Sequence, residues 1–324
     1  MKDCNEDLTI FTTTRNRKES IEIAIKYYSD VNFKGKFLII DASDEIHEKD
    51  FKNSKVDYYW HKGISVIDAY AIAGMLCRTK YMMFLGDDDF LLPNGSRKIL
   101  ESMIGGEQNA AGFGKSMWIY YQDIIEENNI PVDATKNMKR WMLGHKLNIQ
   151  LNIIKGSHKE RLHEIFDNYR VYQFAIITVD LWRKIYNKEY QMLEDDHIQE
   201  IASSIAICLE SAQYRTEKYY MLRGTGHSRP NTLENHENHK LPNLNEMIER
   251  LEKYAISLNY GEKLTKSFAN YALCLRVLGD TNYYALKSAC TKEERIKLSK
   301  ERIDEIRKDE VADEISKLIT LLDK

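Results

Sequence analysis

Three consecutive carboxylates, Asp87, Asp88 and Asp89, are the residues of this sequence best suited to chemistry. They follow the apolar run Tyr81–Leu85, so they begin where a buried strand is expected to end. Carboxylate oxygens are the ligands that Mg²⁺ and Mn²⁺ prefer, and a cation held there can bridge to a diphosphate. Such a cation would neutralise the charge on a departing nucleoside diphosphate. The structural alternative is a solvated turn with a helix cap near Asn94–Ser96.

A second acidic cluster, Glu194, Asp195 and Asp196, precedes the helical pattern of Ile198–Glu210. A carboxylate in this cluster can accept the proton of a hydroxyl as its oxygen attacks an electrophilic carbon, which is general-base catalysis. The alternative is that the acids only complement the dipole at the first turn of the helix.

Two short segments supply further polar candidates. In Gly224–Arg229 the glycines permit close approach of the backbone. There His227 can ligate a metal or contact a phosphate, and Arg229 can clamp a diphosphate. A plain surface turn is the alternative. Lys62 can contact a phosphate and Asp68 a nucleotide, although a solvated lysine and an indirect role of the aspartate are the alternatives.

The elements that must position these residues alternate between strand and helix over the first hundred residues. Strands are expected at 8–14, 37–40, 56–60 and 81–85, and helices at 19–29 and 64–77. Strands separated by helices of this length form βαβ units and a mainly parallel sheet. Ligands bind at the carboxyl ends of such strands. Arg15–Arg17, Asp41 and Asp87–Asp89 all follow strands, so we expect them at one edge of the sheet.

The rest of the chain predicts a two-part organisation. We expect strands at 112–121 and 172–178, and helices at 179–186 and 198–210. An insertion or flexible loop on the acceptor side is expected near 125–168, where no periodicity is clear. A catalytic domain would then cover residues 1–235 and a C-terminal helical region residues 236–324. These helices are expected to pack on the sheet or to form a homodimer; the alternative is that Lys292–Lys308 lies on an anionic membrane surface.

Composition excludes several classes of protein. The 324 residues carry a formal net charge of −3 with interspersed signs, so no positive field attracts nucleic acid. The five scattered cysteines indicate reduced thiols rather than a disulfide framework or a zinc site. No signal peptide or transmembrane run is visible, which predicts a cytoplasmic enzyme, with peripheral contact at the inner face of the membrane left open.

Four motifs in order resemble glycosyltransferases of family 2 with the GT-A fold. Thr14-Arg15-Asn16-Arg17 resembles the opening Thr-x-Asn-Arg segment of that family, and Asp41-Ala42-Ser43 resembles its Asp-x-Ser segment. Asp87–Asp89 resembles the DxD element. Leu193–Asp196 resembles the Glu-Asp pair that carries the catalytic base. One departure is that the Ala-Arg-Asn segment of the family is replaced by Ile67-Asp68-Ala69.

The resemblance implies a role for each matching residue. Asp89 would be the main metal ligand, with Asp87 close to the nucleotide. Apart from the resemblance, Asp87 and His227 are further candidate metal ligands. Asp195 would be the base, with Glu194 and Asp196 as competing assignments, and the reaction would invert the anomeric centre. The residues expected to contact the nucleotide are Thr14, Asn16, Arg17, Asp41, Lys62, Asp68, Asp87, Asp88 and Arg229.

The function implied is that of a hexosyltransferase with an α/β, Rossmann-like GT-A fold. Such an enzyme would need Mn²⁺ or Mg²⁺, and would move a sugar from a nucleotide diphosphate sugar, with a UDP-sugar favoured. The acceptor would be a hydroxyl of a surface glycan, in a capsule or lipo-oligosaccharide, or a lipid-linked glycan. The alternatives are a nucleotidyltransferase, a GT-A-like transferase of a phosphorus-containing group, and a non-catalytic protein that binds nucleotide sugars.

Overall fold

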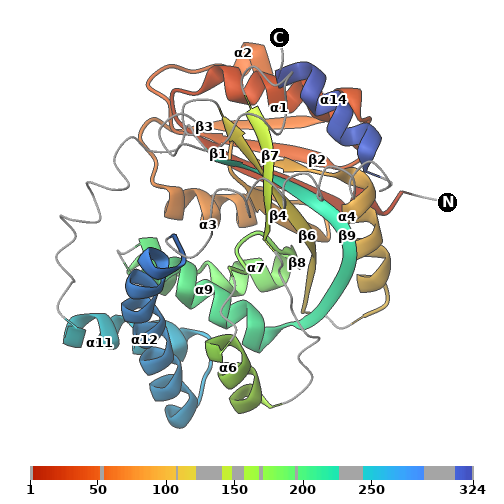
Figure 1. Ribbon diagram of the computed structural model, residues 1–324. Helices are drawn as coiled ribbons and strands as arrows, with labels where there is room; N and C mark the ends of the chain where they lie inside the picture. The colour runs from red at the N-terminus through yellow and green to blue at the C-terminus, as the bar shows by residue number, and fades with distance from the viewer. Residues whose placement is uncertain are drawn as a thin grey trace.

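The computed structural model describes residues 3–51, 55–106, 109–121, 141–147, 157–167, 171–193, 196–225, 244–287 and 311–322. Within these residues the chain forms one nine-stranded sheet with helices packed on it (Figure 1).

Parallel strands form the first half of the sheet, in the order β3-β2-β1-β4. They are β1 (Leu8–Thr14), β2 (Lys36–Asp41), β3 (Val56–Trp60) and β4 (Tyr81–Leu85). β1, β2 and β4 are buried along nearly their whole length, as expected for strands covered on both faces. The register pairs Thr14 with Asp41, so the carboxyl ends of β1 and β2 are neighbours. The four strands predicted in this part of the sequence are thus confirmed.

Two helices make the crossovers between these strands. α1 (Lys18–Asp30) follows β1, and α3 (Val66–Leu76) follows β3. A short helix, α2 (Glu48–Phe51), lies between β2 and β3. α3 begins at Ser65, whose hydroxyl accepts a hydrogen bond from the amide of Asp68. Both predicted crossover helices are confirmed.

The second half of the sheet mixes parallel and antiparallel pairs. β8 (Ile176–Thr178) is antiparallel to β4 and to β6 (Ala110–Tyr121), and β6 is parallel to β9 (Ala212–Thr225). The two-residue strand β5 (Phe90–Leu91) and β7 (Trp141–Leu147) are antiparallel to β9 and β6, respectively. β5 leads directly into α4 (Pro93–Met103). β9 therefore runs beside the segment that follows the acidic turn.

The predicted loop at 125–168 is not loop throughout, because β7 and α6 (His158–Asp167) lie within it. β7 is a strand because it pairs with β6. The periodicity of the segment itself does not reveal this pairing. Residues 122–140 and 148–156 of that segment lie outside the described residues.

The C-terminal helices divide between two parts of the molecule. α11 (Leu244–Ser257) and α12 (Glu262–Lys287) pack near α6, α8 (Lys188–Gln191) and α9 (Asp196–Glu210). α14 (Ala312–Leu322), drawn in dark blue, instead lies on α1 beside the parallel strands (Figure 1). Within the described residues these helices pack on other helices of the chain rather than directly on the sheet. Homodimer formation stays a prediction.

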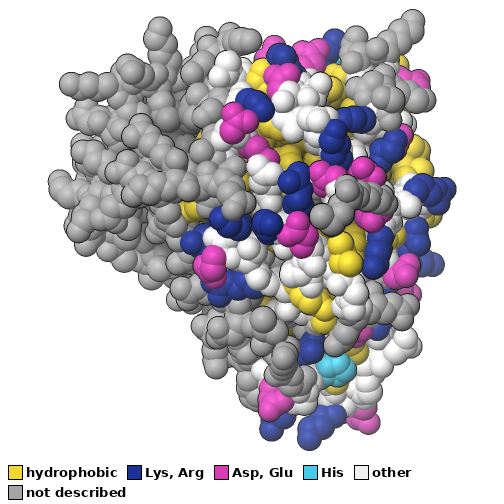
Figure 2. Space-filling model, turned by 90° about the vertical axis from the view of Figure 1, so that its right-hand side faces the viewer, with side chains coloured by type: hydrophobic (Ala, Val, Ile, Leu, Met, Phe, Trp, Pro, Cys, Tyr) yellow, Lys and Arg dark blue, Asp and Glu magenta, His cyan; other side chains and the backbone are white. Residues whose placement is uncertain are grey.

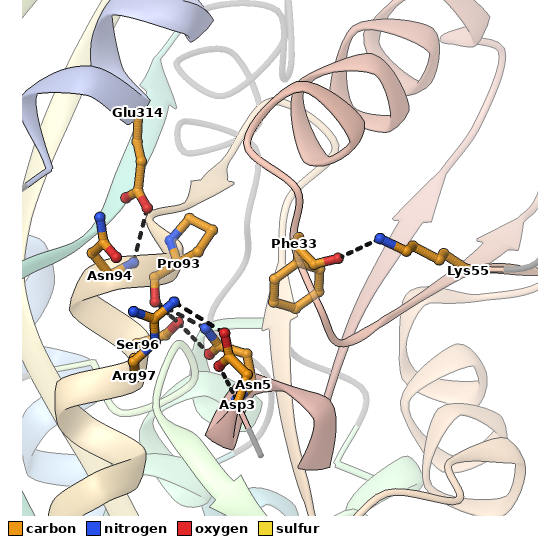
Figure 3. A network of polar contacts seen from close by, with 9 residues as sticks. All are labelled: Asp3, Asn5, Phe33, Lys55, Pro93, Asn94, Ser96, Arg97 and Glu314. Carbon is orange, nitrogen blue, oxygen red and sulfur yellow. Dashed lines mark hydrogen bonds and ion pairs between the residues drawn. The ribbon is translucent and has the colours of Figure 1, made fainter. Parts of the chain in front are cut away.

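A polar contact fastens α14 to the start of α4. The Glu314 carboxylate accepts a hydrogen bond of 2.9 Å from the amide of Asn94, in the first turn of α4 (Figure 3). Nearby, Asn5 and Ser96 bond each other, and Arg97 pairs with Asp3 at 3.0 Å. The two ends of the chain are thus anchored to the same helix.

The surface carries both signs of charge. On the face shown in Figure 2, Lys and Arg side chains are interspersed with Asp and Glu side chains. In the described part of the chain, no helix is long and apolar enough to cross a membrane.

Candidate active site

The acidic turn lies at the carboxyl end of β4, where Gly86 and Asp89 close a tight loop. The amide of Asp89 donates to the carbonyl of Gly86 at 3.1 Å, and the amide of Gly86 donates to Oδ2 of Asp89 at 3.0 Å. The other oxygen of Asp89 accepts from the amide of Gly224 on β9 at 3.0 Å. Both oxygens of this buried carboxylate are therefore engaged by backbone, and Asp89 fastens β9 to the turn.

Asp87 is held by the first strand and the corner after it. Its Oδ2 accepts from the hydroxyl of Thr14 at 3.0 Å, and its Oδ1 forms an ion pair with Nη1 of Arg17. These contacts join β1, the start of α1 and the end of β4, as the sequence predicts for residues that follow neighbouring strands.

Asp88 has the least satisfied carboxylate of the three. Its Oδ2 is buried and has no hydrogen-bond partner among the described residues. The nearest cationic atom with which it pairs is Nη2 of Arg17, at 3.7 Å, which is too long for a hydrogen bond. A buried carboxylate oxygen without a partner is unfavourable unless a ligand completes it. This oxygen is therefore open to a ligand, whereas both oxygens of Asp89 are engaged by backbone amides.

Electrostatics at the turn reflect crowding of like charges under partial burial. The pKa values of Asp87 and of Asp89 are raised to about 6, mainly because the carboxylates are buried and also because Asp88 repels them. The guanidinium of Arg17 acts in the opposite direction on Asp87, and that of Arg223 does so on Asp89. The site is thus an anionic cluster that two arginines only partly neutralise.

Arg223 is a site residue that the sequence analysis did not single out. It lies near the end of β9, directly before Gly224, and its guanidinium carbon is 4.1 Å from the centre of the Phe174 ring. The carbonyl of Phe174 accepts a hydrogen bond from the hydroxyl of Tyr220, which is on β9 as Arg223 is. Phe174 is thereby held beside Arg223. The sequence signal for Arg223 is its position directly after an apolar run and before a glycine. The sequence analysis predicts no strand there, so this signal is missed.

The corner after β1 is pinned to the turn after β2. Asn16 has a φ of 55°, a left-handed conformation that asparagine tolerates. Its amide donates to Oγ of Ser43 at 2.7 Å, and its side chain exchanges two hydrogen bonds with Asp44, at 2.9 and 3.0 Å. The pairing of the Thr-x-Asn-Arg and Asp-x-Ser segments is therefore real in three dimensions.

Asp41 is engaged inside the protein. Its side chain is fully buried, and its two oxygens accept from the amide of Ser43 at 2.8 Å and from the hydroxyl of Tyr58 at 2.6 Å. These bonds shape the turn that receives Asn16. The expected contact of Asp41 with a base or ribose stays a prediction.

Lys62 and Asp68 lie on the exposed rim. Lys62 is 3.7 Å from Oδ1 of Asp44, and both side chains are more than half exposed, at 61% and 53%. The Oδ2 of Asp68 accepts from the hydroxyl of Ser65 at 2.7 Å. Asp68 therefore completes the cap of α3, and a nucleotide contact would compete with that bond.

Four predicted site residues cannot be placed. Glu194, Asp195, His227 and Arg229 lie outside the described residues. Asp196 is the first residue of α9, but its side chain is not described. Within the described part of the chain, no group of three or more His, Cys, Asp or Glu side chains is arranged to hold a metal ion. The predicted set of Asp87, Asp89 and His227 is thus untested.

Comparison with known proteins identifies the fold. The chain is similar to the crystal structure of S. aureus TarS 1–349, with a TM-score of 0.54 and 12% identity over 97% of this chain and 88% of that chain. The same fragment in complex with UDP-GlcNAc gives a TM-score of 0.53 at the same identity and coverage. At this identity the similarity concerns the fold, so the chain has the GT-A-like α/β fold that its sequence predicts. No protein-family model matches the sequence, and no curated protein matches it.

Proposed function

We propose that this protein transfers a sugar from a nucleoside diphosphate sugar to an acceptor hydroxyl, with Asp88 as the carboxylate that holds a divalent cation. The observation that carries the proposal is the buried, unpartnered Oδ2 of Asp88 at the carboxyl end of β4. Support comes from the GT-A-like fold, since a protein of similar fold has been solved in complex with UDP-GlcNAc. Asp88 is preferred to Asp89 because both oxygens of Asp89 are engaged by backbone amides.

The residues around the turn have distinct parts in this proposal. A cation held by Asp88 would offset the negative charge that develops on the leaving diphosphate. Arg17 and Arg223 flank the turn and supply positive charge for the phosphates. The pinned corner at Asn16 keeps the start of α1 at the same edge of the sheet, where the amino end of a helix favours an anion.

The chemical outcome rests on the second acidic cluster. We assign the general base to Asp195, with Glu194 and Asp196 as the competing acids, because this cluster precedes α9 as it does in the family that the sequence resembles. A base on the face opposite the leaving group gives direct displacement and inversion. The sequence resemblance also favours a UDP-sugar donor and a surface glycan as acceptor.

A binding panel tests the proposal. Thermal shift is measured with UDP-GlcNAc and other nucleotide sugars, with and without Mn²⁺, on the wild type and on Asp88→Asn. We expect one donor to raise Tm in the wild type only with Mn²⁺, and the variant to lose that dependence. A chain that no nucleotide sugar stabilises under any metal condition would end the proposal.

The assignment of the general base is tested by comparing sugar transfer by Asp195→Asn with that by the wild type. We expect the variant to lose turnover and to keep donor binding.

A further inference from the structure

Arg17 forms an incomplete bridge across two acids of the turn. Nη1 pairs with Oδ1 of Asp87, while Nη2 lies 3.7 Å from Oδ2 of Asp88. Nη2 is itself buried, and no hydrogen-bond partner for it is found within the described residues. The side chains of Arg17, Asp87 and Asp88 are only 22%, 8% and 10% exposed. Arg17 is thus bonded to Asp87, whereas it lies close to Asp88 without a hydrogen bond to it.

The backbone aims Arg17 at the acids rather than at its own helix. Arg17 is the residue before α1, yet its side chain makes no capping hydrogen bond there. The neighbouring Asn16 is pinned by its amide to Ser43 and by its side chain to Asp44. Because the corner is fixed on this side, the Arg17 side chain is directed toward the turn after β4.

A guanidinium held this close to a carboxylate oxygen opposes the binding of a divalent cation to that oxygen. Mg²⁺ or Mn²⁺ binds carboxylate oxygen at about 2.1 Å, well inside the present distance from Arg17. Two positive centres that close repel, and the effect is larger in a partly buried site than in water. The cation carries the greater charge on a smaller radius, so it displaces Nη2, while Nη1 keeps its bond to Asp87.

We propose that Arg17 is an internal counter-ion for Asp88 that a divalent cation must displace, so that Arg17 weakens cation binding until a diphosphate is present. This inference rests on the proposed function. Once displaced from Asp88, Nη2 becomes a donor for an anionic oxygen of the diphosphate. Cation and nucleotide therefore bind cooperatively, and each lowers the free energy of binding the other.

The test is Mn²⁺ affinity without nucleotide, measured by isothermal titration calorimetry or by electron paramagnetic resonance. Arg17→Gln is expected to bind Mn²⁺ about tenfold more tightly than the wild type, because one unit charge beside the site is removed. The same variant should lose the mutual enhancement between UDP and Mn²⁺. Arg15→Gln is the matched control, since it removes one exposed arginine from the same corner. Its Mn²⁺ affinity should stay within about twofold of the wild type.

Removal of Arg17 leaves Asp87 without its ion pair, so folding is checked by circular dichroism and thermal unfolding. If Arg17→Gln does not fold, the double variant Arg17→Gln/Asp87→Asn is compared with Asp87→Asn alone. The double variant is then expected to bind Mn²⁺ more tightly than that single variant, because the two differ only by the positive charge of Arg17. Unchanged or weaker Mn²⁺ binding by a folded variant overturns the inference and leaves the proposed function intact. A wild type that binds neither Mn²⁺ nor UDP overturns both.

Discussion

The three adjacent aspartates Asp87, Asp88 and Asp89 have different contacts at the carboxyl end of β4. Asp89 accepts from two backbone amides, Asp87 pairs with Arg17 and Thr14, and Asp88 keeps an unpartnered buried oxygen. A carboxylate whose oxygens are engaged by amides stabilises a turn, while one left unpartnered is poised for a ligand. The same residue type therefore stabilises the turn at one position, and at the next position it is the proposed cation ligand.

Paired substitutions separate these roles. Asp89→Asn is expected to lose about 1–3 kcal/mol of unfolding free energy, because the amide can accept with only one of its two groups and the second backbone donor is left unmet. Asp88→Asn should keep or gain stability, since it removes the charge of a buried carboxylate whose Oδ2 has no hydrogen bond, but it should lose Mn²⁺-dependent UDP binding. Urea unfolding and calorimetry are the measurements. Equal destabilisation by both variants would contradict the distinction.

The place of the site is predictable from the sequence, but the division of labour within it is not. An apolar run that ends in charged residues marks a strand end, which is why the sequence places Asp87–Asp89 at the carboxyl end of β4. The engagement of Asp89 depends on the amide of Gly224, 135 residues further along the chain. Because no local pattern carries that contact, the three acids are equivalent from sequence, and the main cation contact was expected at Asp89.

At the scale of elements, β9 presses its end against the acidic turn. A methyl group added at Gly224 would lie 2.5 Å from the backbone oxygen and 2.7 Å from Cγ of Asp88. Gly224→Ala is therefore expected to lose about 1–3 kcal/mol of stability and to weaken Mn²⁺ binding, because β9 or the turn must move. Gly261→Ala, where an added methyl meets nothing within 4 Å, is the control. If both variants behave alike, the close approach has no role in the site.

α14 is a second element whose packing can be tested, because burial of its residue Glu314 changes the pKa of that carboxyl. Val311, Ile315, Leu318 and Leu321 are buried in its interface. The pKa of Glu314 is raised to about 7, mainly because the carboxyl is buried and also because Asp313 repels it. The hydrogen bond from the Asn94 amide and the positive charges of Arg97 and Lys317 lower the pKa and offset part of this rise. A carboxyl whose pKa is raised by folding binds more protons in the folded state, so its contribution to stability falls as pH rises.

The dependence of stability on pH tests this docking. Between pH 5 and pH 8 the wild type should lose about 2 kcal/mol relative to Glu314→Gln, whose amide oxygen still accepts from Asn94. Asp313→Asn, which alters an acid of the same helix that is 77% exposed, should show no such difference. Urea unfolding at both pH values is the measurement. Parallel pH profiles of wild type and Glu314→Gln would contradict the assignment.

The elements themselves are predictable to different degrees. β1, β3 and β4 begin and end where the sequence pattern places them, because each is a short run rich in β-branched, aromatic or aliphatic residues. β7 and β9 are not predictable in this way. Their sequences alternate poorly, and their pairing with β6 is decided by contacts distant in sequence.

At the scale of the whole molecule, a chain of aromatic rings joins the sheet to the C-terminal helices. Its successive pairs are Phe11–Trp182, Trp182–Tyr186, Tyr186–Tyr190, Tyr190–Tyr254 and Tyr254–Phe268, with ring centroids between 4.0 and 5.8 Å apart. The contacts pass from β1 through α7 (Val179–Ile185) and α8 to α11 and α12. The predicted boundary near residue 235 therefore does not separate two independent hydrophobic cores.

Tyr254 is the ring through which this continuity is best tested. It is fully buried, and its hydroxyl donates to the carbonyl of Ile185 at 3.1 Å, so it joins α11 to the end of α7 by packing and by a hydrogen bond. Tyr254→Ala is expected to lose about 3–5 kcal/mol of unfolding free energy. Amide hydrogen exchange should rise in α7 and α8 as well as in α11, because the cavity removes support from both sides. Ile256→Ala, on the same helix but 60% exposed, should change stability by less than about 0.5 kcal/mol. Faster exchange confined to α11 would mean that the C-terminal helices form a separate unit, as the sequence organisation suggests.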